Sequence, residues 1–328
     1  MRLLAVDDDP VVLDLLKLIF KSADLPEVSV TSSAVLALEM LSNPDFEFDG
    51  LILDISMPEM SGIELCRLVR RMPRYQHKPI LMLTSVMDTA SVESAFAAGA
   101  DDYITKPFDV KDIVARVRVA ERMTQKSQPV AMIDRDLCKE TDKPGLHQFS
   151  IEDPLRIHGA PQLIQPFALG NYLCQLSRRR LDNCVLFAVQ LCDIDTLYQT
   201  CKTHELARGL HGVVTAVSEV VKCPTMLTAY EGSGILMCIT LGSEPPAWPE
   251  MEYRVRDAIA AQNLCRDDGT KMCLEVAVGN PITPSASRYQ RVNKTFERTR
   301  SRVHTRMQST HAQSEAEADD DDGQISSA

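Results

Sequence analysis

The first 122 residues predict an α/β domain built on a parallel sheet, and three observations lead to this fold class. Apolar runs of strand length alternate five times with segments whose apolar residues recur at helical spacing. The run at 51–54 is apolar until its final carboxylate, as in a strand buried on both faces. Ser61 to Glu64 then has capping-box spacing, which predicts a helix start. Because parallel strands are joined by right-handed crossovers, all five strands should end at the same rim.

Residue types mark where these elements begin and end. Asp9 precedes Pro10, and this pair favours a helix start, since aspartate caps helices and proline suits the first helical position. Asp88 is expected to cap the fourth helix, and Asp109 the fifth. The strands are expected at residues 3–6, 27–30, 51–54, 80–83 and 101–104, and the helices begin near residues 10, 35, 61, 88 and 109.

Polar side chains follow the strands at the shared rim, namely Asp7, Asp8, Asp54, Thr84 and Lys106. Mg²⁺ in proteins is held by one or two carboxylates, by waters and by phosphate oxygens. Acids, a lysine and a hydroxyl together predict a site that takes a phosphoryl group onto a carboxylate, where catalysis is mostly positioning and electrostatics. Taken one at a time, the acids could be helix caps and the lysine a solvated side chain. The prediction therefore depends on the joint pattern.

These residues resemble the receiver domain of bacterial two-component response regulators, and the resemblance covers residues 1–122. The matching motifs are Val-Asp-Asp at 6–8, Asp54 with Met57-Pro58 and Gly62, Thr84, and Lys106-Pro107. The resemblance implies a flavodoxin-like fold with the strand order 2-1-3-4-5. It also implies that Asp54 is phosphorylated by a phosphohistidine, on a sensor histidine kinase or a phosphotransfer protein.

The resemblance also implies a role for each rim residue. Mg²⁺ is held by Asp8, Asp54 and the backbone after it, while Asp7 supports the metal and its waters. Lys106 pairs with the phosphoryl oxygens. Thr84 and Tyr103 act as a switch, in which the hydroxyl moves to the phosphoryl group and the ring turns inward. This alters the face formed by the fourth helix, fifth strand and fifth helix. Homodimers through that face are common in similar receivers, although no residue here demands one.

The remaining chain is expected to form a linker and a second domain. Residues 123–166 are expected to be a partly ordered linker, because prolines recur and the helical spacing fades. Residues 167–307 are expected to form an α+β domain. Its strands are predicted at 183–192, 225–230, 235–241 and 272–278, and its helices at 167–178, 206–221, 253–261 and 289–303.

The second domain is similar in its element order to the GGDEF domain, the diguanylate cyclase fold. A long strand ending in Asp193-Ile194-Asp195, a hairpin, and Val-Ala-Val-Gly at 276–279 carry this resemblance. The hairpin reads Glu-Gly-Ser-Gly-Ile at 231–235, so Ser233 and Gly234 stand where active members have acidic residues. Asp193 alone would remain to hold metal, whereas joining two GTP molecules requires carboxylates for Mg²⁺.

Guanine recognition is also expected to be lost. The resemblance places the family's lysine on Tyr198 and its guanine-reading side chains on Cys201 and Leu210. We therefore expect a degenerate GGDEF-like domain that is not an enzyme and that signals by protein contact. Two alternatives remain, the first being a diguanylate cyclase that makes cyclic di-GMP with a non-standard site. The weaker one is a DNA-binding regulator that acts through the basic segment at 288–306.

Composition and charge exclude several protein classes. The chain has 328 residues and a formal net charge of −11, which argues against general nucleic-acid binding. No apolar stretch reaches the roughly 20 residues that span a bilayer, and the start does not resemble a signal peptide. The ten cysteines lack metal-binding spacing, which predicts reduced thiols in a cytoplasmic protein. The acidic residues 308–328 are expected to form a disordered tail.

Overall fold

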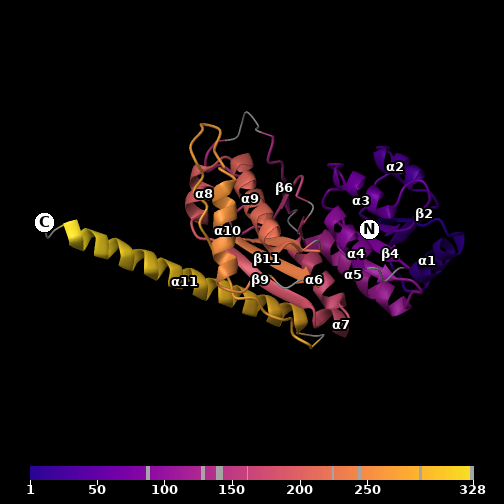
Figure 1. The fold of residues 1–328 in the computed structure, drawn as a ribbon. Coiled ribbons are helices and arrows are strands. Elements are labelled where there is room, and N and C mark those ends of the chain that lie inside the picture. Colours follow the sequence, from indigo (N-terminus) through magenta and orange to yellow (C-terminus); the bar gives the residue numbers. More distant parts are fainter. Residues whose placement is uncertain are drawn as a thin grey trace. The chain divides into compact units, whose positions relative to one another are not determined.

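The computed structural model describes residues 1–85, 89–126, 130–137, 143–160, 162–223, 225–242, 245–287 and 290–325. The chain divides into two compact units, Met1–Val130 and Ala131–Ala328 (Figure 1). The first unit therefore ends beyond the predicted boundary at residue 122. The reason is that its last helix, α5, continues to Lys126.

The first unit contains a five-stranded parallel sheet in the predicted order, β2-β1-β3-β4-β5. The strands are β1 Arg2–Val6, β2 Glu27–Thr31, β3 Gly50–Asp54, β4 Ile80–Thr84 and β5 Asp102–Thr105. Every residue of β3 and β4 is buried, because helices cover both faces of the sheet. In the register of the sheet, Asp54 lies beside Leu83 and Thr84 beside Thr105. The strands therefore end at one rim, as predicted.

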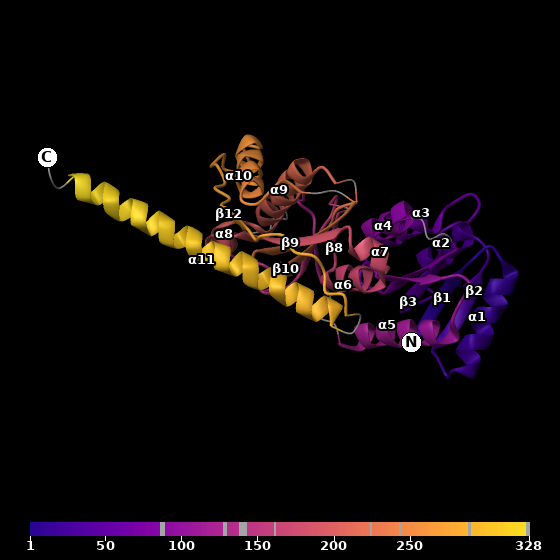
Figure 2. The same cartoon turned by 60° about the horizontal axis from the view of Figure 1, so that its bottom comes forward.

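Five helices enclose this sheet, namely α1 Pro10–Ser22, α2 Ala34–Ser42, α3 Gly62–Arg70, α4 Thr89–Ala98 and α5 Val110–Lys126. Helices α1 and α5 pack on one face, and α2, α3 and α4 lie on the other (Figure 2). Asp9 Oδ1 accepts a hydrogen bond from Val11 N at 2.8 Å, and Ser61 Oγ accepts one from Glu64 N at 3.2 Å. These two predicted helix starts are confirmed. Asp88, the predicted cap of the fourth helix, lies outside the described residues.

The second unit is built on a five-stranded mixed sheet in the order β12-β9-β11-β10-β8. Its strands are β8 Leu163–Ile164, β9 Cys184–Leu191, β10 Leu227–Gly232, β11 Ile235–Leu241 and β12 Val276–Val278. Strand β8 pairs with β10 in parallel, and the other neighbours are antiparallel. Two further strands, β6 Ala131–Ile133 and β7 Leu155–Ile157, form a small parallel sheet of their own.

The predicted linker at 123–166 needs correction, because most of it is folded into the second unit. It supplies β6, β7 and β8, and Ile133, Leu155 and Leu163 belong to the core of that unit. Two of the prolines that suggested a connector stand instead at the starts of elements. Pro154 precedes β7, and Pro166 opens helix α6, where proline's fixed φ suits the first turn.

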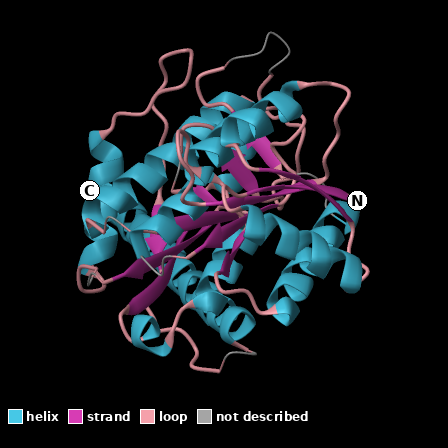
Figure 3. Ribbon diagram, turned by 90° about the vertical axis from the view of Figure 1, so that its right-hand side faces the viewer, coloured by secondary structure: helices cyan, strands magenta, loops and turns pink. Residues whose placement is uncertain are grey.

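Helices cover both faces of the second sheet. They are α6 Pro166–Gln175, α7 Arg178–Leu181, α8 Ile194–Thr200, α9 Thr203–Val221, α10 Glu250–Ala261 and α11 Arg291–Ile325. Helices α8, α9 and α10 share one core with the sheet, through side chains such as Leu197, Val213 and Val255. Helices α6 and α11 pack on the other face. Figure 3 colours the strands, helices and loops of the whole chain. In the described part of the chain, no helix combines the length and apolarity that a membrane span requires.

Helix α11 is much longer than predicted. It continues to Ile325, and its C-terminal part extends beyond the sheet (Figures 1 and 2). The prediction that residues 308–328 are disordered is therefore wrong as far as Ile325. Alanine, glutamate and glutamine are strong helix formers, and a helix already nucleated by packing is extended without a second nucleation cost. Residues 326–328 lie outside the described chain.

A buried ion pair that no sequence pattern indicated joins α3 to the segment before β5. Arg70 Nη2 lies 2.8 Å from Asp101 Oδ2, and the two side chains are only 5% and 4% exposed. The same guanidinium donates hydrogen bonds to the carbonyl oxygens of Gly99 at 2.8 Å and Lys78 at 2.6 Å. Removing one member of a buried pair leaves the other charge desolvated without its counter-ion, which is strongly destabilising.

Replacing Arg70 with leucine is therefore expected to lower the free energy of unfolding of the first unit by about 3 kcal/mol. Urea denaturation followed by circular dichroism measures this loss. The matched control is Arg67→Leu, because Arg67 is exposed on the same helix, and its effect should stay below about 0.5 kcal/mol. Equal losses in the two variants would show that the buried pair contributes nothing specific.

Candidate functional site

The carboxyl ends of four strands bring the predicted site residues to one rim. Asp7 follows β1, Asp54 ends β3, Thr84 ends β4 and Lys106 follows β5. Lys106 Nζ lies 2.6 Å from Asp7 Oδ2 and 2.5 Å from Asp54 Oδ1. One ammonium group therefore bridges two carboxylates from different strands, and we call this arrangement the lysine bridge.

Backbone groups hold the remaining oxygens of both bridged carboxylates. Asp7 is 0% exposed and Asp54 is 3% exposed. Asp9 N donates a hydrogen bond to Asp7 Oδ1 at 3.1 Å, and Ser56 N donates one to Asp54 Oδ2 at 2.8 Å. Each carboxylate thus has one oxygen oriented by the backbone and the other directed at Lys106.

The lysine bridge shifts the proton affinities of its members. Burial raises the pKa of Asp7 above its ordinary value, although Lys106 opposes this effect. Burial disfavours the charged form of Lys106 as well, but its hydrogen bonds and charge interactions with Asp54 and Asp7 outweigh burial and raise the pKa of Lys106. Lys106 therefore remains a cation at neutral pH, ready to pair with an anionic group.

The residues at this rim fit a divalent cation. Asp8, next to Asp7 in the chain, is exposed. Three carboxylates at −1 each and one lysine at +1 leave a net charge of −2. Asp7 Oδ2 is buried and has Lys106 Nζ as its ion-pair partner, and its further acceptor capacity could take a metal-bound water. In the described residues, the ligand atoms of these three acids do not all lie within 4.8 Å of one another.

Close packing after β3 holds Asp54 at the rim. Gly62 N donates a hydrogen bond to Ile55 O at 3.1 Å. A Cβ atom on Gly62 would lie 1.9 Å from Asp54 O, so no other residue fits without moving the strand end. This contact gives a physical reason for the glycine in the predicted motif.

Thr84 and Tyr103, the predicted switch residues, lie on the neighbouring strands β4 and β5. Thr84 is buried at the end of β4, and its carbonyl oxygen accepts a hydrogen bond from Lys106 N at 2.7 Å. Tyr103 is 7% exposed and packs edge-to-face on Phe96 of α4, with ring centroids 6.2 Å apart. The ring is therefore turned inward in this structure. The switch role of both residues stays a prediction.

In the second unit, the residues of the predicted cyclase remnant lie near one another but offer little negative charge. Ser233 and Gly234 form the turn between β10 and β11, and Asp193 is exposed before α8. A Cβ atom on Gly234 would lie 3.0 Å from the Cβ of Ile194, the residue after Asp193. Gly234 also has φ +78°, so an acidic side chain at this position would be strained.

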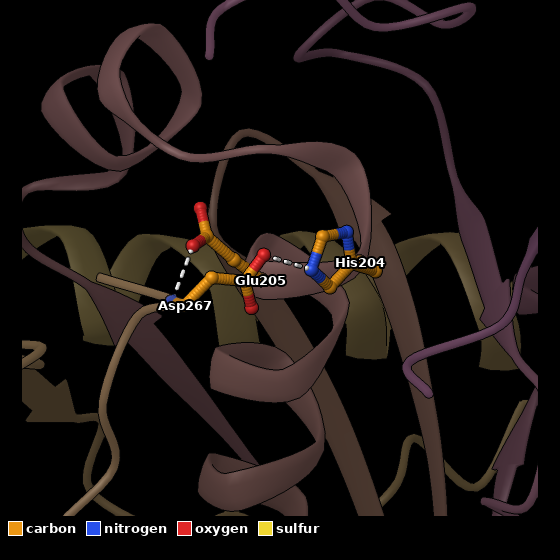
Figure 4. Close-up of side chains that lie close together, drawn as sticks. All are labelled: His204, Glu205 and Asp267. Carbon is orange, nitrogen blue, oxygen red and sulfur yellow. Dashed lines mark hydrogen bonds and ion pairs between the residues drawn. The ribbon is translucent and has the colours of Figure 1, made fainter. Parts of the chain in front are cut away.

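A second group of ligand-type side chains, His204, Glu205 and Asp267, was not predicted (Figure 4). His204 Nε2 lies 2.8 Å from Asp267 Oδ2, and the two carboxylate oxygens of Glu205 accept hydrogen bonds from the backbone N–H groups of Lys202 and Asp267. Lys202 and Arg208 pair with Asp267 at 3.0 and 3.4 Å. These cations and the positive end of α9 disfavour a metal ion. The cluster instead ties the start of α9 to the segment around Asp267.

The sequence signal for this cluster is faint. Glu205 stands at the third position of α9, as in a capping box, but Lys202 is not a residue type that caps helices. His204 and Asp267 are distant in the chain, and no periodic spacing or motif relates them. Their contact becomes visible only in the folded chain.

Comparison with known proteins addresses the first unit. Residues 3–118 match the family model described as "Response regulator receiver domain". The "DNA-binding dual master transcriptional regulator RpaA" of Synechocystis is 36% identical over 126 residues, which cover 38% of this chain and 51% of that protein. The "DNA-binding response regulator MtrA" of Mycolicibacterium smegmatis is 37% identical over 134 residues, which cover 40% and 55%. The chain spans about half the length of the curated relatives that it matches.

Among solved structures, the "Chemotaxis response regulator CheY4 of Vibrio cholerae" is 28% identical. The alignment covers 36% of this chain and 97% of that chain, with a TM-score of 0.34. The family-model match agrees with the resemblance seen in the sequence over the first unit. The GGDEF-like character of the second unit stays a prediction.

The lysine bridge predicts a pH-dependent stability. Lys106→Met is expected to lower the free energy of unfolding by about 2 kcal/mol near neutral pH, because Asp7 and Asp54 lose their counter-charge. A raised pKa means that Lys106 stabilises the fold fully below its ordinary pKa of 10.5, and that this contribution is lost as the pH rises through the folded-state pKa. The stability difference between wild type and variant, measured by urea denaturation, should therefore shrink at the alkaline end.

The matched control for this prediction is Lys111→Met, since Lys111 is exposed on α5. Its effect should stay within about 0.5 kcal/mol at every pH. A Lys106→Met difference that remains constant through the alkaline range would contradict a stabilising role for the lysine bridge.

Proposed function

Since residues 3–118 form a response regulator receiver domain, we propose that this chain is a response regulator of a phosphorelay. Asp54 accepts a phosphoryl group from a phosphohistidine on a sensor histidine kinase or a phosphotransfer protein. The N–P bond of the donor breaks as the bond between an Asp54 oxygen and phosphorus forms. The observation that carries this proposal is the 2.5 Å contact between Lys106 Nζ and Asp54 Oδ1. A cation against the accepting carboxylate offsets the charge of the incoming group.

The proposed cofactor is Mg²⁺, held by Asp8, Asp54 and the backbone after it, with Asp7 in support. The net charge of −2 at this rim supports the assignment, as does the exposure of Asp8. When bound, the ion would neutralise charge on the phosphoryl oxygens. The chain's own groups orient the acceptor, because Ser56 N holds Asp54 Oδ2 and Lys106 contacts Oδ1.

Thr84 and Tyr103 are the proposed relay from this site. Thr84 ends β4, the strand that pairs with β3 and Asp54. The carbonyl oxygen of Thr84 accepts a hydrogen bond from Lys106 N. Tyr103 lies on the following strand and packs against α4. A movement of the Thr84 hydroxyl toward a phosphoryl group would be relayed through these two strands, so that the surface of α4, β5 and α5 would change.

We propose that the second unit is a degenerate GGDEF-like domain that signals by protein contact and catalyses no reaction. Cys201 and Leu210, which stand at the guanine-reading positions of that family, are both 0% exposed in the core. Asp193 is exposed, and the turn offers Ser233 and Gly234 in place of carboxylates. Without paired acids or polar base contacts, nothing in this region supports the turnover of a guanine nucleotide.

The names of RpaA and MtrA include DNA binding, which favours the alternative of a DNA-binding regulator. In this chain, however, the basic segment behind that alternative is largely engaged in packing. Arg300 makes two hydrogen bonds to Glu231, and Arg306 makes three to Glu252. Arg291 donates to three carbonyl oxygens at the end of α6. Arg288 and Tyr289 lie outside the described residues. We therefore keep protein contact as the proposed output.

Incubation with Mg²⁺ and acetyl phosphate should place one acid-stable, base-labile acyl phosphate on the wild-type chain and none on Asp54→Asn. Lys106→Met should slow this reaction by about 100-fold, because the cation against the accepting carboxylate is lost. Phosphate-affinity electrophoresis measures the phosphorylated fraction. Asp45→Asn is the matched control, since Asp45 is exposed away from the rim, and it should be phosphorylated like wild type. Equal labelling of wild type and Asp54→Asn would exclude Asp54 as the acceptor.

The cyclase alternative is tested by incubating the phosphorylated chain with GTP and Mg²⁺. We expect cyclic di-GMP to stay at the background seen without protein, because the turn lacks the acids that hold the metal. Liquid chromatography with mass spectrometry detects the product. Turnover that is lost in Asp193→Asn would establish the alternative and refute an output by contact alone.

A further inference from the structure

Residues 143–153, which we call the strap, lie in the chain between the paired strands β6 and β7. Helix α5 ends at Lys126 and β6 begins at Ala131, so the strap lies on the covalent path from the receiver to the second sheet. The β6–β7 ladder holds the two ends of this connection through only three residue pairs. The strap and β6 thus belong to one connection, whose two ends meet in this ladder.

The first part of the strap, residues 145–149, is hydrogen-bonded to the end of α8 and the start of α9. His147 Nε2–H donates to Tyr198 O at 2.8 Å, and His147 Nδ1 accepts from the Thr203 hydroxyl at 3.0 Å. The Tyr198 hydroxyl donates to Phe149 O at 2.5 Å, and Gly145 N donates to Cys201 O at 3.1 Å. The rings of His147 and Tyr198 also lie against each other, with centroids 4.3 Å apart.

The last part of the strap, Ile151 and Glu152, packs against the β10–β11 turn. Ser233 N donates to Ile151 O at 2.7 Å, and a Cβ on Gly232 would lie 2.1 Å from Glu152 O. Gly232, Ser233 and Gly234 have φ values of +97°, +49° and +78°. Successive residues of this kind present backbone N–H groups in a small concave array that suits an acceptor group. Here the strap itself supplies that acceptor.

The strap is held mainly by these hydrogen bonds. None of its residues is fully buried, and Leu146 is 65% exposed. Phe149 and Ile151 pack against the core only in part. Segments with few buried apolar contacts and solvent-accessible hydrogen bonds open at lower free energy than the core does. Among the described residues of this path, the strap is therefore a part that can detach while the sheet stays folded.

We propose that the strap is an autoinhibitory latch that phosphorylation of Asp54 releases. While latched, it covers the Ser233 N–H group and engages the Tyr198 hydroxyl. Once released, it exposes the Ser233 N–H group on the β10–β11 turn and the Tyr198 hydroxyl on α8 to a downstream protein that offers an acceptor group. This inference rests on the proposed phosphorylation, and it names the element of the second unit that responds to it.

The test is hydrogen exchange of the full chain, followed by mass spectrometry on peptides that cover the strap and on peptides from β9. Tyr198→Phe removes the hydroxyl bond to Phe149 and should speed exchange in the strap by about fivefold without acetyl phosphate. Wild type treated with acetyl phosphate and Mg²⁺ should show a similar increase, and Asp54→Asn should show none. Tyr253→Phe is the matched control, because Tyr253 is 56% exposed on α10, and it should behave like wild type.

Intact-mass measurement on the same samples separates the two proposals. If Asp54 gains no phosphoryl group, the proposed function fails. If the phosphorylated chain shows unchanged or slower strap exchange, the latch is overturned while the proposed function stands. An equal increase in β9 would also overturn the latch, because the whole unit rather than the strap would then be opening.

Discussion

A single ammonium group placed between two buried carboxylates is the interaction on which the first unit depends. Asp7 and Asp54 come from strands far apart in the chain, and at this depth two uncompensated acids would repel each other strongly. Lys106 compensates both at contact distance, 2.6 and 2.5 Å. The parallel sheet makes the arrangement possible, because it delivers every strand end to the same rim. The remaining negative charge then suits a divalent cation and a phosphoryl group that arrive together.

The second unit uses charge for a different purpose. Its closing helix carries a dense set of arginines, and a basic face of this kind commonly indicates nucleic acid or anionic lipid. In the folded chain, Arg300 and Arg306 are bonded to Glu231 and Glu252, and Arg306 also lies 5.6 Å from the centre of the Trp248 ring. Arg291 satisfies carbonyl groups at the end of α6 that the helix leaves without partners. These contacts fasten α11 to the unit and leave less positive charge for an outside partner.

The turn between β10 and β11 lacks the acidic side chains that would bind a metal ion, but its backbone still makes a specific contact. Gly234 packs too closely on Ile194 for an acidic side chain to fit without strain. Gly232 allows the backbone of Glu152 to approach, and Ser233 N donates to the strap. Glycines and positive φ values that would suit a bound anion thus serve a contact within the chain.

The sequence by itself determined the architecture of the first unit and its rim. Alternating apolar periods predict the five strands and their parallel direction, and polar residues directly after apolar runs predict which side chains meet. The order of the strands came from the resemblance to receiver domains. This works because the strand and helix periods are local properties, and the direction of parallel strands then places their ends together. For this reason Asp54 and Lys106 could be predicted to lie at the same rim.

Only the tertiary structure decided the rest. The short strands β6, β7 and β8 were missed because two or three residues carry no readable period, and their identity comes from pairing with distant segments. The contacts of Arg70 with Asp101 and of His204 with Asp267 were not predicted for a related reason, since a contact between distant residues depends on which surfaces face each other. The same holds for the basic helix, because the sequence shows its charges whereas the fold decides which of them are already paired. The sequence shows which side chains are charged or polar, but the packing of the folded chain determines which residues they contact.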